Sequence, residues 1–325
     1  MRLDARRLTA SMVFGLLAGV SFSSAGPADG RILATAPDVL AESWDQLPEG
    51  YRDQFTREEY ERVRAGGDVE RLRVVYSSGG LRVTGFVSRP AHVARGAELP
   101  AIVYNRGGNR DYGAIDAWDK VIFHRLAESG FVVLASQYRG ADGGEGSDEF
   151  GGSDVQDVMS LFPLARGLGY VDMRNVFMLG FSRGGMMTYL AIRDGAPVRA
   201  AAVVGGLSDL PGLAAYRPPM RRMWTRLWAS FGGGTEALME ERSAIRWPER
   251  LDKPLLLLHG GGDRRVPLDQ SLRLAAALRA AGGTVQLCVF PDDGHELARH
   301  GVERDARVVG WFREFRASSQ ARPGA

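Results

Sequence analysis

The sequence predicts an α/β protein built on a mainly parallel sheet with helices on both faces. The chain has 325 residues, 45% hydrophobic and 25% charged, which is typical of a globular protein with one large domain or at most two. From residue 100 onward, short apolar runs alternate with helical segments of roughly ten residues or more, a pattern typical of βαβ units. Earlier, two β-rich runs at 71–76 and 81–87 flank Gly79-Gly80, which predicts an antiparallel hairpin at one sheet edge.

The other elements follow from apolar runs and their flanking glycines and prolines. Strands are expected at residues 100–104, 131–135, 176–179, 199–204, 254–258 and 285–290. Helices are expected at residues 57–65, 117–129, 154–168, 184–193, 271–281 and 302–316. Pro163 predicts a defect in the helix at 154–168, because proline has no N–H to donate.

Residues 1–25 have the pattern of a secretory signal peptide. Basic residues precede an apolar run at 8–22, and small residues end at Ala25. We expect an exported protein, periplasmic or secreted; an uncleaved N-terminal membrane anchor is the alternative, although the run is shorter than the ~20 residues of a membrane span. Loss of this segment changes the formal net charge from +2 to 0, which predicts no attraction to nucleic acid and no stable membrane insertion.

Two segments interrupt the regular pattern. Residues 26–69 are polar and proline-rich and are expected to form a surface extension before the main domain at 70–320. Residues 207–250 follow a predicted strand and are expected to form a small helical cap on the ligand-binding side of the sheet. Trp224 and Trp228 in this cap are candidates for substrate contact; alternatively, they attach the cap to the domain.

The motif Gly180-Phe181-Ser182-Arg183-Gly184 joins the strand at 176–179 to the helix at 184–193. A serine on such a sharp turn has strained backbone angles that expose its hydroxyl above the sheet. Glycines two residues before and after it avoid collisions where strand and helix cross. The positive end of the helix dipole also favours an anion beside the serine. Ser182 is therefore the candidate nucleophile.

Position along the chain selects one of the five histidines as the general base. His295 lies in the loop between the last strand and the last helix, the place of the base in proteins with this serine turn and the chain order Ser, acid, His. Asp263, which follows the strand at 254–258, is the expected acid. Asp209, which follows the preceding strand, is the competing candidate.

Two backbone N–H groups are expected to bind the oxyanion. One belongs to Arg183, directly after the nucleophile, and the other to Gly108 in the glycine-rich loop after the strand at 100–104. No metal or organic cofactor is needed for this chemistry. The single cysteine, Cys288, excludes an intrachain disulfide and is expected in a buried strand.

These motifs together resemble the catalytic domain of the prolyl oligopeptidase family of serine peptidases. The resemblance rests on residues 180–185, 259–267 and 291–295, and on Tyr138-Arg139-Gly140 with Asp157. It spans about residues 70–317 and implies an α/β-hydrolase fold and hydrolysis of peptide or ester bonds through an acyl-enzyme. The residues before it are too few for the β-propeller of the large family members.

The same domain without a propeller also resembles acyl esterases and dienelactone-type hydrolases, so an exported carboxylesterase is the alternative function. A non-catalytic binding protein of this fold would be expected to lack a member of the Ser, Asp, His set. Arg106 and Arg183 flank the predicted oxyanion site; if they face the substrate, they favour an acidic or neutral acyl group over a free amine. We therefore expect short esters to be better substrates than free-amine peptides, unless both arginines pair with carboxylates such as Asp111 or Glu145.

Overall fold

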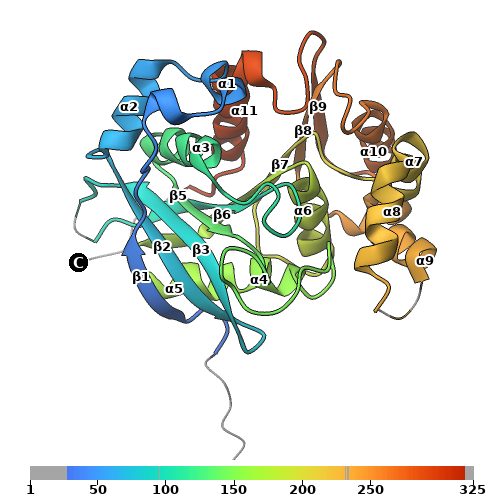
Figure 1. Cartoon of the computed structure of the whole chain (residues 1–325), viewed down its shortest axis with the longest axis horizontal. Coiled ribbons are helices and arrows are strands. Elements are labelled where there is room, and N and C mark those ends of the chain that lie inside the picture. The colour runs from blue at the N-terminus through green and yellow to red at the C-terminus, as the bar shows by residue number, and fades with distance from the viewer. Residues whose placement is uncertain (1–27, 95, 231, 233, 319–325) are drawn as a thin grey trace, which may run out of the picture.

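A computed structural model describes residues 28–318 except 95, 231 and 233. The predicted signal segment at 1–25 lies outside the described residues. Within them, one sheet has the strand order β1-β2-β3-β5-β4-β6-β7-β8-β9 (Figure 1). The strands are β1 (Ile32–Pro37), β2 (Val69–Ser78), β3 (Leu81–Pro90), β4 (Leu99–Asn105), β5 (Val132–Ser136), β6 (Val171–Phe181), β7 (Ala201–Val204), β8 (Leu255–Gly260) and β9 (Val285–Phe290).

The strand pairing confirms the predicted fold class. Strands β2 and β3 form the antiparallel hairpin, and β4 to β9 form a parallel sheet. Strand β3 pairs antiparallel with β5, which joins the two parts. Strand β1, which the sequence did not predict, adds an antiparallel edge beside β2. Its side chains are mostly exposed, so it lacks the apolar alternation by which strands are recognised.

The principal helices largely match the predicted ones. They are α1 (Glu49–Arg52), α2 (Arg57–Ala65), α3 (Ala117–Glu128), α4 (Val155–Met159), α5 (Leu161–Gly167), α6 (Arg183–Arg193), α7 (Leu210–Tyr216), α8 (Pro218–Leu227), α9 (Gly234–Glu241), α10 (Asp269–Ala280) and α11 (Gly301–Glu314). The helix expected at 154–168 is two helices that meet at Ser160. The break lies one turn before Pro163, because proline cannot donate to the carbonyl four residues earlier.

Alternate residues of the parallel strands enter two apolar cores. In β6, Val176 and Met178 belong to the core that also contains side chains of helices α4, α5, α6 and α10. Phe177 and Leu179 pack with α3 and α11 on the other face. Burial on both faces explains why these strands are continuous apolar runs in the sequence.

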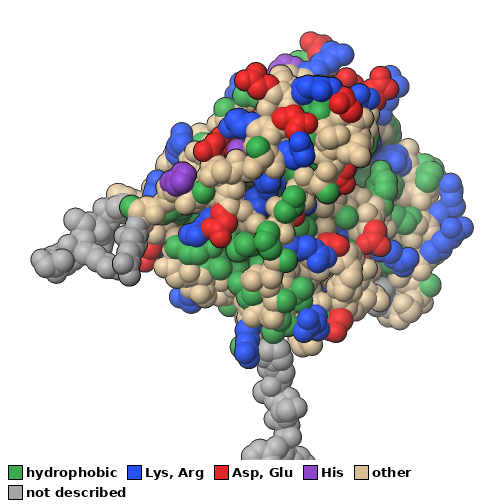
Figure 2. Space-filling model, turned by 60° about the vertical axis from the view of Figure 1, so that its left-hand side comes forward, with side chains coloured by type: hydrophobic (Ala, Val, Ile, Leu, Met, Phe, Trp, Pro, Cys, Tyr) green, Lys and Arg blue, Asp and Glu red, His purple; other side chains and the backbone are tan. Residues whose placement is uncertain are grey.

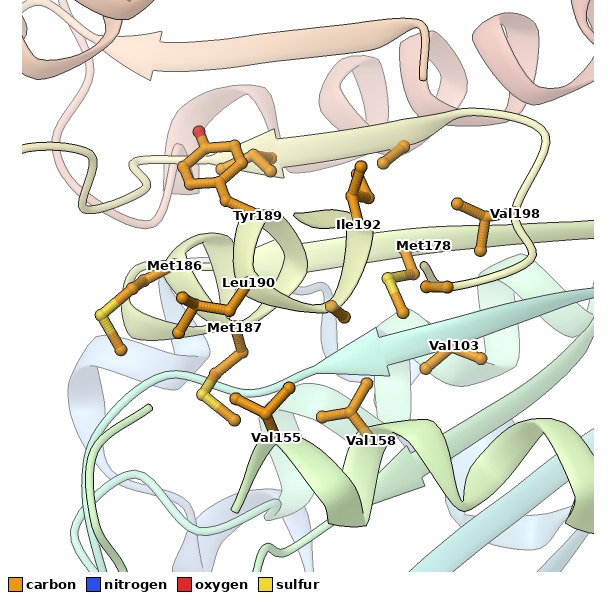
Figure 3. Close-up of a cluster of buried hydrophobic side chains, with 14 of the residues drawn as sticks. Val103, Val155, Val158, Met178, Met186, Met187, Tyr189, Leu190, Ile192 and Val198 are labelled. Atoms are coloured by element: carbon orange, nitrogen blue, oxygen red, sulfur yellow. The ribbon is translucent and has the colours of Figure 1, made fainter. Parts of the chain in front are cut away.

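Helix α6 is held on several sides by apolar side chains. Figure 3 shows Met187 and Leu190 on the side that faces Val155 and Val158 of α4, with Ile192 farther along the helix. All residues of α6 from Arg183 to Ile192 are buried. The N-terminal end of α6, which follows Ser182, is therefore fixed by the core.

The N-terminal extension and the cap lie on different sides of the domain. In Figure 1, α1 and α2 are at the upper left, and the cap helices α7 to α9 are at the right edge. The extension has a small core of its own, in which Phe55, Tyr60 and Val63 pack with Val121 of α3. Both segments reach the cavity described below.

The surface in Figure 2 carries positive and negative side chains interspersed, with hydrophobic residues between them. Among the described residues, no helix combines the length and hydropathy of a transmembrane segment.

Candidate active site

Ser182 lies on a strained turn between β6 and α6. Its backbone has φ 54° and ψ −119°, a conformation that non-glycine residues rarely adopt. Two hydrogen bonds hold it there: Ser182 N donates to Val204 O (2.9 Å), and Ser182 O accepts from Gly185 N (2.9 Å). Ser182 lines a cavity that is described below.

Gly184 is required because α6 passes very close to the end of β4. A Cβ built on Gly184 would lie 1.8 Å from the carbonyl oxygen of Asn105, a backbone atom that cannot rotate away. A Cβ on Gly180 would likewise lie 2.3 Å from Gly184 O. The spacing of the two glycines around Ser182 therefore follows from this close crossing.

We expect Gly184→Ala to destabilise the protein strongly. Overpacking typically costs about 1–3 kcal/mol, and a clash with fixed backbone should reach or exceed the upper end of that range. Gly310→Ala is the matched control, because a Cβ at Gly310 in α11 meets no atom within 4 Å. This control should raise stability by up to about 1 kcal/mol. Urea denaturation measures both; equal midpoints for wild type and Gly184→Ala would contradict the expected clash.

Asp263 and His295 form a hydrogen-bonded pair beside the end of β8. His295 Nδ1 lies 2.6 Å from Asp263 Oδ2, and the Asp263 side chain is fully buried. A carboxylate can only accept, so Nδ1 donates and Nε2 of His295 keeps its lone pair. Asp263 Oδ1 accepts from the N–H groups of Arg265 (2.8 Å) and Val266 (2.9 Å), which fix the carboxylate.

The competing candidate, Asp209, is engaged elsewhere. Its side chain accepts from Gly212 N at the start of α7 (3.1 Å) and pairs with Arg273 (2.6 Å). Asp209 therefore serves as a helix cap, and Asp263 is the carboxylate bonded to the histidine.

Opposing effects act on the pKa of Asp263. Burial raises this pKa, but the hydrogen bonds from His259 and His295 and the nearby His295 charge outweigh burial, so the pKa lies below the usual aspartate range. Asp263 is therefore an anion at neutral pH, as the orienting acid of a catalytic histidine must be.

His259 is a neighbour of the acid that the sequence did not assign to the site. It is fully buried, and its Nε2 lies 2.9 Å from Val266 O and 3.3 Å from Asp263 Oδ2. Because a carbonyl only accepts, Nε2 carries the proton and Nδ1 accepts from Ser271 Oγ (2.7 Å). The sequence placed His259 at the end of a strand four residues before Asp263, which was the one available signal.

The loop that follows β4, residues 106–113, lies directly against Ser182. A Cβ built on Gly107 would be 3.3 Å from the Ser182 Cβ. Gly108 has φ 66°, and a Cβ there would lie 1.9 Å from Tyr112 O, so only glycine fits. Among the described residues, no acceptor is bonded to the N–H of Gly108 or of Arg183. Both residues line the cavity together with Ser182 and His295.

The expectation that Arg106 binds substrate is wrong. Its side chain is fully buried, does not line the cavity, and donates to backbone carbonyls. The Arg183 side chain is also buried and pairs with Asp148 and Asp154, not with the suggested Asp111 or Glu145. The two guanidinium charges therefore do not argue against an amine-bearing substrate.

Trp224 and Trp228 were also wrongly expected to contact substrate. Both are buried outside the cavity lining, and their rings stack with centroids 5.8 Å apart. The Trp228 indole N–H donates to Glu149 O (2.8 Å), and Trp224 packs edge-on against Phe150. They attach the cap to the domain, which is the alternative that the sequence left open.

The cavity has a volume of about 600 Å³ and two contrasting walls. The cap contributes an apolar wall made of Leu213, Met220 and Met223, and not of the tryptophans singled out in the sequence analysis. The opposite wall combines Tyr51 and Gln54 of the N-terminal extension with the start of α3. The extension therefore contributes to the cavity, which was not expected from its sequence.

Two carboxylates, Asp116 and Asp119, lie in the wall at the start of α3. Tyr51 donates to Asp116, and Tyr104 donates to Asp119 (2.5 Å). Burial and then the neighbouring Asp116 raise the pKa of Asp119 to about 7. This wall therefore carries a partial negative charge near neutral pH, a feature that the sequence did not predict.

The model of the prolyl oligopeptidase family matches residues 118–318. The chain belongs to this family. It is 34% identical over 211 residues to the uncharacterized peptidase YtmA of Bacillus subtilis, covering 63% of this chain and 78% of YtmA. It is 28% identical over 261 residues to the human acylamino-acid-releasing enzyme, covering 72% of this chain and 34% of that enzyme.

Solved structures show the same fold at low sequence identity. The acylaminoacyl peptidase of Pyrococcus horikoshii has a TM-score of 0.63 and 22% identity, covering 80% of this chain and 43% of that protein. A puromycin-hydrolyzing peptidase of Mycobacterium tuberculosis has a TM-score of 0.61 and 24% identity, covering 73% and 37%. The protein is thus a serine hydrolase of the prolyl oligopeptidase family that spans less than half of these structures.

Proposed function

We propose that this protein hydrolyses short peptides and esters through an acyl-enzyme formed on Ser182. The observation that supports this best is the 2.6 Å hydrogen bond between Asp263 and His295, in the cavity that Ser182 also lines. Among the described residues, no hydrogen bond joins the Ser182 hydroxyl to His295; such contacts are often long before substrate binds.

In the proposed reaction, Ser182 Oγ attacks the substrate carbonyl while His295 Nε2 accepts its proton. The tetrahedral oxyanion binds to the N–H groups of Gly108 and Arg183. His295 then protonates the leaving amine or alcohol, and the acyl group remains on Ser182. Water then attacks this ester while His295 Nε2 accepts a proton from it. His295 returns this proton to Ser182 Oγ as the acid is released, which restores the free serine.

The proposed substrates are short because the cap and the N-terminal extension wall the cavity on two sides. The preference for esters expected from the sequence rested on the positive charges of Arg106 and Arg183. Both guanidinium groups are buried and bonded to groups inside the protein. Amides with free or blocked N-termini are therefore included with the esters. The name of the human relative refers to acylated amino acids, which is compatible with this range.

A matched pair of substrates tests the acyl-enzyme. A p-nitrophenyl ester and a p-nitroanilide with the same short acyl group are hydrolysed in the presence of hydroxylamine, which competes with water for the acyl-enzyme. We expect both to be cleaved and to give the same ratio of hydroxamate to acid, because they share one intermediate. Different ratios would exclude a common acyl-enzyme. If the ester is cleaved and the anilide is not, the protein is instead a carboxylesterase.

The same assay, run with free-amine and N-acetylated anilides and with an intact folded protein, tests the substrate range. We expect turnover of the short substrates, with the folded protein resistant. Degradation of the folded protein as fast as the anilides would contradict a walled cavity.

A further inference from the structure

Arg106 uses a buried guanidinium to hold the backbone of the loop beside the nucleophile. Nη1 donates to the carbonyl oxygens of Gly107 (3.0 Å) and Gly113 (3.1 Å). Nη2 donates to those of Arg110 (2.6 Å) and Gln137 (2.6 Å), and Nε donates to Gln137 O (3.0 Å). Each of the five guanidinium N–H groups therefore has a carbonyl acceptor, and three of the four carbonyls belong to the 106–113 loop.

Arg183 holds the next carbonyl of the same loop. Its Nη1 donates to Gly108 O (3.0 Å) and to Asp148 Oδ2 (2.6 Å), and its Nη2 donates to Asp148 Oδ1 (2.8 Å) and to Asp154. Asp148 Oδ2 also accepts from Arg110 N (2.7 Å). The side chains of Arg183 and its two acidic partners are 1% exposed or less, so this cluster is shielded from water.

These contacts determine where the Gly108 N–H points. The carbonyl of Gly107 and the N–H of Gly108 belong to one planar trans peptide group, and they point in opposite directions. Because Arg106 binds the Gly107 carbonyl, the Gly108 N–H must point away from Arg106. Arg183 fixes the following peptide group through Gly108 O, so both peptide groups that flank Gly108 are held by guanidinium groups.

We propose that Arg106 and Arg183 are positioning residues that aim the Gly108 N–H at the oxyanion. The inference rests on the proposed function, in which Gly108 N–H is one of two oxyanion donors. Neither side chain touches substrate; each acts through a backbone carbonyl. The two arginines were considered in the sequence analysis as groups that face the acyl group of the substrate. In this proposal they instead orient a backbone donor.

The charge of the guanidinium groups strengthens the donor as well as orienting it. A cation bound to a peptide carbonyl polarises that peptide and makes its N–H more positive, because linked hydrogen bonds polarise one another. Tyr138 stabilises the arrangement: its ring centroid lies 5.0 Å from the Arg106 Cζ and 4.9 Å from the Arg183 Cζ. Its hydroxyl also donates to Arg106 O (3.2 Å).

Lysine variants provide the test, because lysine keeps the charge but presents its donors from one atom. A single ammonium cannot span the carbonyls of Gly107, Arg110 and Gly113 as the planar guanidinium does. We expect Arg106→Lys and Arg183→Lys to lower kcat by roughly 10- to 100-fold, less than the 10²–10³-fold typical of a lost oxyanion donor. KM should stay within about 3-fold, because the interaction matters mainly in the transition state.

A second measurement separates positioning from a general structural role. A peptidyl trifluoromethyl ketone adds to the serine and forms an oxyanion, so its Ki should rise by the same factor as kcat/KM falls. The acid product forms no oxyanion, so its Ki should not change. Arg71→Lys is the matched control: Arg71 is buried and donates to Val63 O (2.7 Å) and Asp38 O (3.4 Å), away from the site. It should lower the melting temperature and leave kcat near wild type.

Asp148→Asn is a further variant in case the lysine variants fold poorly, because it weakens the anchor of Arg183 and keeps an acceptor. We expect kcat to fall in Asp148→Asn as well, but by a smaller factor than in the lysine variants. Wild-type kcat in folded Arg106→Lys and Arg183→Lys would overturn the proposal, as would equal weakening of ketone and product binding, or loss of folding in all three variants. Failure of the proposed function is distinguishable, because activity would then survive Ser182→Ala.

Discussion

Ser182→Ala is expected to abolish turnover of both esters and anilides and to prevent labelling by a fluorophosphonate probe. Loss of the nucleophile from a serine triad typically lowers kcat by about 10⁶-fold, because the acyl-enzyme cannot form. The fold should survive, since the Ser182 backbone makes its own hydrogen bonds to Val204 and Gly185. Circular dichroism and the melting temperature check that the variant is folded.

Ser318→Ala is the control for this experiment, because Ser318 is exposed near the end of the described chain. It should be labelled and should turn over substrate like wild type. Probe labelling that persists in Ser182→Ala would show that another residue is the nucleophile, and the site would have to be reassigned.

Asp263→Asn is expected to lower kcat by about 10⁴-fold while the fold persists. The carboxylate holds Nδ1–H of His295 and leaves Nε2 free to accept the serine proton; an amide can donate to Nδ1 and favour the inactive tautomer. The asparagine Oδ1 can still accept from Arg265 N and Val266 N, so the turn should be retained. Steady-state kinetics on the paired ester and anilide measure the effect.

Asp209→Asn is the matched control, since Asp209 caps α7 and pairs with Arg273. We expect kcat near wild type and a stability loss of about 1 kcal/mol or less, because asparagine is also a good N-cap. A large loss of kcat in Asp209→Asn, with Asp263→Asn unaffected, would reverse the assignment of the acid.

Acid stability gives a second readout for Asp263. Its pKa in the folded protein is depressed, so its ionised form stabilises the fold above the ordinary aspartate pKa of about 3.9. That stabilisation is lost as the pH falls below this value toward the folded-state pKa. Wild type should therefore lose stability relative to Asp263→Asn as the pH falls below about 4, and a constant difference would contradict the depressed pKa.

Local patterns in the sequence were sufficient for most of the fold. The apolar runs of the inner parallel strands β4, β5, β7 and β8 are continuous because these strands are buried on both faces, and this burial acts residue by residue. The serine turn was recognisable because Gly180 and Gly184 are required by a close crossing within a few residues. The strand β1 escaped prediction because it is defined by pairing with β2 and not by an apolar pattern.

The positions of His295 and Asp263 after their strands were also readable, because the carboxyl ends of parallel strands meet at one edge of a sheet. The hydrogen bond between them joins residues that are 32 positions apart, and it could be inferred only from that shared edge. His259 was not inferred, because a buried histidine at a strand end has no distinct sequence pattern.

The sequence by itself therefore determined the strand and helix pattern, the serine turn and the chain order of serine, acid and histidine. Each of these depends on local backbone sterics or on burial periodicity, which are properties of short segments. Only the tertiary structure decided the roles of Arg106, Arg183 and the cap tryptophans. Arg183 meets Asp148, 35 residues away, and Arg106 meets Gln137, 31 residues away, through loops from different strands. Which charges meet depends on how those loops pack, and the spacing of charged residues along the chain does not encode it.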